Sequence, residues 1–177
     1  MEVTLNVNGK EIKATISAEE WKKIQSQPKK TGYERRQCGD KIFYSDRDGF
    51  LETLCERDGV TDYTLYSVAN YYSDMTVAEN NARADALMRK LRRFAAEHGG
   101  CLSKKDINKN NDKLSIINYC KDDLCVFVFD AENIIHPVGM ICFKSAEAAK
   151  LAIEEFRDEL IWYFTEYSPM PEGYYED

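Results

Sequence analysis

The chain has 177 residues, of which 44% are hydrophobic and 12% aromatic, and it carries a formal net charge of −7 at pH 7. This length suits one domain or two small domains packed together, and the aromatic share excludes a disordered chain. The negative charge argues against a partner that is simply a phosphate backbone. No signal-peptide pattern opens the chain, and no apolar run approaches the roughly 20 residues of a membrane helix, so we expect a soluble, cytosolic protein.

The first predicted region, residues 1–27, is a hairpin followed by a short helix. Val3–Val7 and Glu11–Ile16 both alternate polar and apolar residues, which is typical of strands. Asn8-Gly9 lies between them, and this pair favours a tight turn because both residues tolerate a positive φ. Ser17-Ala18-Glu19-Glu20 is a capping box, which opens a helix.

The second predicted region, residues 28–100, begins with a linker and holds three strand-like stretches and a long helix. The stretches are Lys41–Tyr44, Phe50–Leu54 and Tyr63–Tyr72. A hydroxyl cap at Thr76 opens the helix, which runs to about His98 before Gly99-Gly100 ends it. Its apolar face is formed by Ala84, Leu87, Met88, Leu91, Phe94 and Ala95.

The third predicted region, residues 101–177, repeats this order of strands before a helix. Leu114–Cys120 and Leu124–Phe129 form a hairpin, and Val138–Phe143 is a third strand. Residues 125–129 are apolar without alternation, which favours a central strand covered on both faces. Ser145 caps a helix that runs to about Phe164, and an acidic tail follows.

These elements predict the α+β class: an N-terminal hairpin and short helix, followed by two strand-strand-strand-helix units with mostly antiparallel sheets. We expect residues 28–177 to form one compact body. The sequence leaves open whether the two units share one sheet.

The residues that catalysis would need are scarce. The only histidines are His98, whose expected place at a helix end suits a capping role, and His136, in a predicted loop. No Ser, Cys or Asp is tied to either by a motif, so a Cys–His nucleophile would depend on tertiary contacts alone. Asp46-Arg47-Asp48-Gly49 fits turn chemistry better than a calcium loop, because the loop's last glutamate and its flanking helices are missing.

The six cysteines contain no C-x-x-C pair, and in a reducing compartment they should be free thiols. Cys120 and Cys125 bracket the predicted turn, so together with Cys101 or Cys142 they would be able to coordinate zinc. Without paired short spacings we expect no metal and no cofactor.

Charge is unevenly placed along the chain. From Arg83 to Lys113 there are nine basic and four acidic residues, whereas from Lys150 to Asp177 there are two basic and eight acidic ones. Solvated helix faces and a polarised surface that steers a charged partner both remain open. Candidate partner-binding residues are Arg89, Lys90, Arg92 and Arg93, which would follow a phosphate backbone, and Glu154, Glu155, Asp158 and Glu159, which would imitate one.

Short pieces between about Lys41 and Leu160 form a further pattern: Tyr71-Tyr72, Thr76–Glu79, Leu91–Ala95, Lys113–Ile116, Cys142–Ser145, Ala149, Ala152-Ile153 and Leu160. On these pieces the chain from about Lys41 to Leu160 resembles a family of small uncharacterised proteins carried by phages and prophages of gut Firmicutes. The N-terminal segment Ile16–Glu20 also fits. These are structural caps and core positions, so the resemblance implies no residue roles.

The resemblance implies a mobile-element accessory protein of the host bacterial cytosol, not an enzyme. Proteins of this size and origin include anti-CRISPR proteins against type II effectors. We therefore expect a non-enzymatic inhibitor that binds a bacterial defence nuclease complex with its guide RNA, and that blocks DNA binding or cleavage. The alternatives are a nucleic-acid-binding accessory or regulatory protein of a phage and, as a third class, a metal-dependent enzyme.

Overall fold

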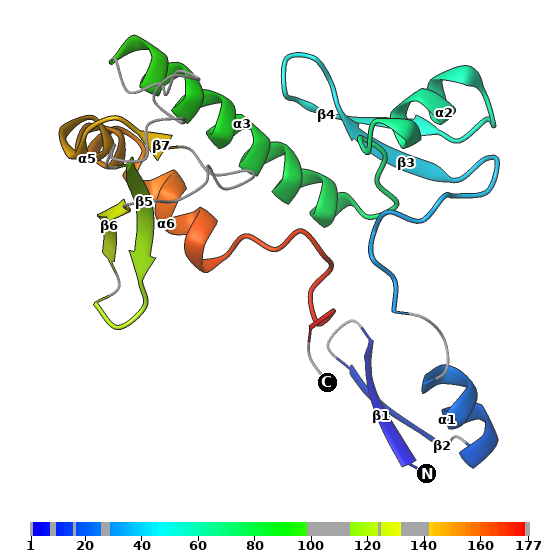
Figure 1. Ribbon diagram of the computed structural model, residues 1–177. Helices are drawn as coiled ribbons and strands as arrows, with labels where there is room; N and C mark the ends of the chain where they lie inside the picture. The colour runs from blue at the N-terminus through cyan, green and yellow to red at the C-terminus, as the bar shows by residue number, and fades with distance from the viewer. Residues whose placement is uncertain are drawn as a thin grey trace.

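The computed structural model has the predicted α+β class, and it describes residues 2–7, 10–15, 17–25, 29–98, 114–123, 125–131 and 142–175 (Figure 1). The strands are β1 (Glu2–Val7), β2 (Lys10–Thr15), β3 (Lys41–Ser45), β4 (Leu51–Cys55), β5 (Leu114–Cys120), β6 (Cys125–Ala131) and β7 (Cys142–Phe143). The helices are α1 (Ala18–Gln25), α2 (Val60–Ser67), α3 (Met75–Glu97), α5 (Ala146–Glu155) and α6 (Arg157–Thr165).

The predicted N-terminal hairpin and the first two strands predicted after it are confirmed. β1 pairs antiparallel with β2, and Val7 stands opposite Lys10. β3 pairs antiparallel with β4. In the turn between β3 and β4, Asp46 Oδ1 accepts hydrogen bonds from the backbone N–H groups of Asp48 (2.9 Å) and Phe50 (2.8 Å). The Asp46 carboxylate therefore stabilises the turn, as the sequence predicts.

The strand predicted over residues 63–72 is wrong, because the first half of that stretch lies in helix α2. Gly59 is the N-cap residue, and Asp62 Oδ2 accepts hydrogen bonds from the backbone N–H groups of Gly59 (2.9 Å) and Arg57 (3.1 Å). Within this stretch, the described β pairing is limited to an isolated antiparallel bridge between Phe43 and Tyr72. A favourable start to the helix thus outweighs the β preference of the tyrosines.

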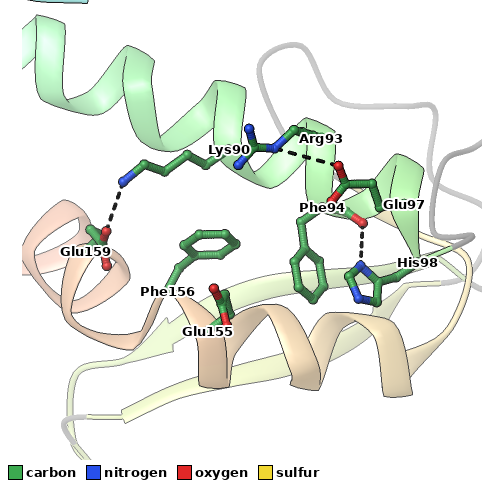
Figure 2. A pocket seen from close by; sticks show the side chains of 8 residues that line it. All are labelled: Lys90, Arg93, Phe94, Glu97, His98, Glu155, Phe156 and Glu159. Atoms are coloured by element: carbon green, nitrogen blue, oxygen red, sulfur yellow. Dashed lines mark hydrogen bonds and ion pairs between the residues drawn. The ribbon is translucent and has the colours of Figure 1, made fainter.

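Helix α3 begins two residues earlier than the sequence predicts. Its N-cap is Asp74, whose side chain accepts from the backbone N–H of Val77 (3.0 Å), so the predicted hydroxyl cap at Thr76 is wrong. Its predicted C-terminal end is confirmed, because His98 is the C-cap residue and the His98 Nδ1–H donates to the carbonyl of Phe94 (3.0 Å; Figure 2). An aspartate at the N-terminus also suits the helix dipole.

The described strands form separate sheets, and the C-terminal one has the order β6-β5-β7. β5 pairs with β6 in the predicted hairpin, with Cys120 opposite Cys125. Among the described strands β6 lies at the edge of this sheet, so the predicted central position of residues 125–129 is wrong. Its side chains alternate, with Val126 and Val128 half-buried and Phe127 and Phe129 exposed. The described part of the third strand is β7, and residues 138–141 lie outside the described residues.

The long helix predicted at the C-terminus is in fact two helices. Ser145 caps the first, α5, as predicted, because its side chain accepts from the backbone N–H of Ala148 (3.2 Å). Phe156 then leaves the helical region and is both the C-cap of α5 and the N-cap of α6. The break turns α6 so that Leu160 and Trp162 are buried.

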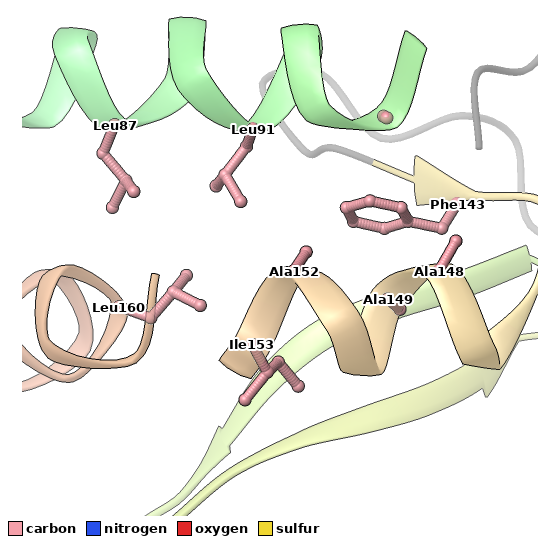
Figure 3. Packing of buried hydrophobic residues seen from close by; sticks show 9 residues of the cluster. Leu87, Leu91, Phe143, Ala148, Ala149, Ala152, Ile153 and Leu160 are labelled. Carbon is pink, nitrogen blue, oxygen red and sulfur yellow. The ribbon is translucent and has the colours of Figure 1, made fainter. Parts of the chain in front are cut away.

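The main core lies where α3 crosses α5 and α6, above the C-terminal sheet (Figure 3). Small alanines on α5 allow α3 to approach closely, and the Phe143 ring fills the space beside them. α3 also contacts β3 and β4, so it joins the β3–β4 hairpin to the C-terminal layers (Figure 1). The buried cluster consists of Leu87, Leu91, Ala95, Phe143, Ala148, Ala149, Ala152, Ile153 and Leu160.

Candidate functional site

A groove of about 470 Å³ lies between the C-terminal half of α3 and the junction of α5 with α6 (Figure 2). We call it the α3–α6 groove. Four of the eight candidate residues line it: Lys90 and Arg93 from one side, and Glu155 and Glu159 from the other. The remaining lining residues are Phe94, Glu97, His98 and Phe156.

Opposite charges partly neutralise one another in this groove. Lys90 Nζ lies 3.2 Å from Glu159 Oε1, and Arg93 Nε lies 3.8 Å from Glu97 Oε1. Both pairs are at least partly exposed, so each contributes little to stability. The fold thus brings Lys90 and Arg93 of α3 opposite Glu155 and Glu159, although the sequence alone suggested separate surfaces of opposite charge.

The other four candidate residues lie outside the α3–α6 groove. Arg89 and Arg92 are exposed on α3, and the Arg89 guanidinium lies beside Gly49 in the turn between β3 and β4. Asp158 is exposed on α6, and Glu154 faces β6 on the opposite side of α5. No single site therefore collects all eight.

His98 has a structural role in this groove. Its ring stacks on Phe94 with 3.9 Å between ring centroids, while its Nδ1 is bonded to the helix end. No cysteine or serine is bonded to His98 among the described residues, and His136 lies outside them. The described part of the chain also holds no group of three or more His, Cys, Asp or Glu side chains placed to bind a metal ion.

The described cysteines are free thiols, as predicted, and Cys101 lies outside the described residues. Cys120 and Cys125 are opposite each other across the hairpin, but the Cys120 thiol interacts with Asp123 (3.4 Å). Cys142 is buried beneath α5, and this burial raises the pKa of its thiol. A buried thiol of this kind behaves as a small hydrophobic side chain.

A buried polar network beside α2 was not predicted from the sequence. Its centre is Glu56, whose side chain is fully buried. Glu56 Oε2 accepts from the hydroxyl of Tyr71 (2.5 Å), and Glu56 Oε1 accepts from the Arg35 guanidinium (3.1 Å) and from the backbone N–H of Asp58 (2.9 Å). The Tyr71 hydroxyl in turn accepts from the backbone N–H of Arg36 (2.9 Å). We call these residues the Glu56 network.

The ionisation of this network follows from its contacts. Burial by itself would raise the pKa of Glu56, but hydrogen bonds from Tyr71, Asp58 and Arg35 outweigh burial and lower it. Burial and the bond to the Glu56 carboxylate raise the pKa of Tyr71 to about 12. Near neutral pH the network therefore holds a buried carboxylate and a neutral phenol that are both hydrogen-bonded, whereas the buried Arg35 Nε forms no hydrogen bond within the described residues.

Above the Glu56 network, helix α2 exposes apolar and aromatic side chains, and we call this surface the α2 face. Val60 is 84% exposed and Tyr63 is 57% exposed, and Tyr66 and Val68 are also exposed. The only buried residue of α2 is Asp62. The Arg35 guanidinium carbon lies 3.9 Å from the centre of the Tyr63 ring, so the buried network also fixes an exposed tyrosine.

Glu34 anchors the segment that leads into the Glu56 network. Its carboxylate accepts hydrogen bonds from the backbone N–H and hydroxyl of Thr31, from the backbone N–H of Gly32 (3.1 Å) and from the hydroxyl of Ser73 (2.9 Å). Burial opposes ionisation, but these bonds outweigh it and lower the pKa of Glu34 to about 2, from an ordinary 4.5.

The Glu34 carboxylate should therefore stabilise the fold above about pH 4.5, and this contribution should disappear as the pH falls towards about 2. We expect Glu34→Gln to lower the free energy of unfolding at pH 7 by about 2 kcal/mol, because the amide cannot accept all of these bonds. In urea titrations, the difference in the free energy of unfolding between the variant and the natural chain should shrink steadily below pH 4.5. Glu79→Gln, on the exposed side of α3, should change the free energy by less than about 0.5 kcal/mol. A difference that stays constant with pH would contradict this prediction.

No helix within the described residues combines the length and apolar character that crossing a membrane requires. Comparison of the chain with known proteins gives no match to a family model, to a curated protein or to a solved structure.

Proposed function

We propose that this protein acts by binding another protein through the α2 face, and that it catalyses no reaction. The observation that carries the proposal is the exposure of Val60 and Tyr63 on a helix held in place by a buried polar network. Tyrosine and arginine are the side chains most enriched at the energetic centres of protein interfaces. Because Arg35 already holds the Tyr63 ring, binding would cost little side-chain entropy there.

For the partner, we propose a bacterial defence nuclease complex, namely a type II CRISPR effector with its guide RNA. The resemblance to phage and prophage proteins supports this choice. Stoichiometric binding would block DNA binding or cleavage, and a stable complex would bury roughly 1,200–2,000 Å².

The alternative function is nucleic-acid binding by the basic residues of α3. Arg89 and Arg92 support it, because both are exposed and neither forms an ion pair with another described residue. Lys90 argues against it, because it lies 3.2 Å from the Glu159 carboxylate, and a nearby negative charge weakens attraction to phosphates. The two functions depend on different surfaces and are therefore separable by mutation.

The test measures binding to the purified effector–guide complex together with inhibition of DNA cleavage. We expect Val60→Lys and Tyr63→Ala each to weaken binding at least about tenfold, because both change the centre of the α2 face. Tyr175→Ala is the matched control, since Tyr175 is also an exposed tyrosine but lies in the C-terminal tail. Circular dichroism would check that each variant is folded.

Two outcomes would contradict the proposal in different ways. If the natural chain neither binds this complex nor inhibits cleavage, the proposed partner is wrong. If it binds and the α2 variants bind equally well, the proposed surface is wrong. Affinity for DNA or RNA that falls steeply with salt and drops in Arg89→Ala/Arg92→Ala would favour the alternative function.

A further inference from the structure

The outer edge of β6 is not covered by any other strand within the described residues. Among the described strands β6 pairs only with β5. β6 contains no proline, and its single charged residue is Asp130 near its end; charges and proline are the features that usually prevent edge strands from pairing with another chain. Phe129 is 48% exposed, and Phe127 is exposed beside it. A partner that covers both the backbone groups of this edge and its exposed phenylalanines would lower the free energy of the strand.

Beside this edge, the helices carry a stripe of charges that alternate in sign. In chain order they are Glu147, Lys150, Glu154 and Arg157. The last three line a groove of about 420 Å³, together with Val126, Phe127, Val128 and Ile153. No member of the stripe forms an ion pair with another residue in the described part of the chain.

The order of these charges is self-complementary under a two-fold axis. If two copies of the stripe run antiparallel with Ala152 at the axis, Lys150 of one copy meets Glu154 of the other. Glu147 and Arg157 share this midpoint in the sequence, but Arg157 lies on α6, beyond the break at Phe156, so Lys150 and Glu154 are the pair that the alignment joins. The exposed side chain of Leu151 lies next to the midpoint and would meet its own counterpart. A surface that matches itself in this way is what a symmetric dimer requires.

The distances between strands and between helices are compatible with such a dimer. α5 packs over β5 and β6, and adjacent strands in a sheet lie about 4.8 Å apart. If β6 paired antiparallel with the β6 of a second copy, the two α5 helices would stand about 10 Å apart on the same side of a six-stranded sheet. That is close to the interaxial distance of packed helices, roughly 8–10 Å.

We infer that this protein forms a symmetric dimer in which the β6 edges pair and the α5 stripes face each other. The occupant of this surface is thus a second copy of the chain. The inference does not depend on the proposed function, because the α2 face belongs to another part of the fold (Figure 1).

The test is sedimentation equilibrium of the full chain over a range reaching about 100 µM, which detects even weak dimers. We expect the natural chain to dimerise, and we expect Lys150→Glu and Glu154→Lys each to weaken the dimer at least about tenfold through repulsion between like charges. The double variant K150E/E154K should dimerise again, and so should a mixture of the two single variants. Lys41→Glu makes the same change of charge on β3 and should have no effect.

A second variant tests the strand edge itself. Phe127→Lys places a charge on the exposed face of β6 and should give monomers that retain the natural circular dichroism spectrum. A natural chain that stays monomeric at about 100 µM would overturn the inference. So would a dimer that neither single charge reversal weakens, or a loss of dimer that the charge swap does not restore.

Discussion

Glu56→Ala is expected to lower the free energy of unfolding by about 2–4 kcal/mol, because it removes the acceptor at the centre of a buried network. The Tyr71 hydroxyl would lose its acceptor at 2.5 Å, and Arg35 would lose its partner at 3.1 Å. The lower part of the range applies if the Arg35 guanidinium, whose side chain is one quarter exposed, turns towards water.

Urea unfolding at pH 7 would measure this loss, and Glu52→Ala provides the matched control. Glu52 is also a glutamate of the β4 segment, but it is exposed, so its removal should change the free energy of unfolding by less than about 0.5 kcal/mol. Equal effects of the two substitutions would show that the Glu56 network contributes nothing specific to stability.

Phe143→Ala is expected to lower the free energy of unfolding by about 3–5 kcal/mol, through lost burial and the cavity left behind. The Phe143 side chain has no exposed surface and packs between α3 and the alanines of α5 (Figure 3). The site cannot easily collapse, because α3 also contacts β3 and β4 and is held in place there. Thermal and urea unfolding would both report the loss.

The control for this core substitution is Phe50→Ala, which removes a phenylalanine that is 70% exposed in the turn between β3 and β4. It should change the free energy of unfolding by less than about 0.5 kcal/mol. A loss of less than about 1 kcal/mol for Phe143→Ala would mean that α3 and α5 move together to fill the space.

Local signals in the sequence predicted most of the elements. The alternating runs around Asn8-Gly9, the turn before Cys125 and the cap at Ser145 are each complete within a few residues, and the structure confirms the hairpins and the helix start they predict. One error arose where two signals compete. The tyrosines around Tyr63 favour a strand, but the cap formed by Gly59 and Asp62 begins a helix.

The remaining features depend on contacts between segments that are far apart in the sequence, so no local sequence pattern predicts them. The apolar run at Cys125 is compatible with a central strand or an edge strand, and only the placement of β5 and β7 distinguishes them. The Glu56 network joins Arg35 to a partner 21 residues away and Tyr71 to one 15 residues away, without a motif. The break at Phe156 likewise depends on how α6 packs against α3.

Helix α3 acts as a spacer of fixed length. Its 23 residues span about 35 Å, and its two halves pack against different layers of the fold. In a symmetric pair of chains, two α2 faces would therefore be displayed at one defined separation. The first contact with a multi-copy target would then raise the effective concentration for the second, so avidity would depend on target geometry as well as on the affinity of a single surface.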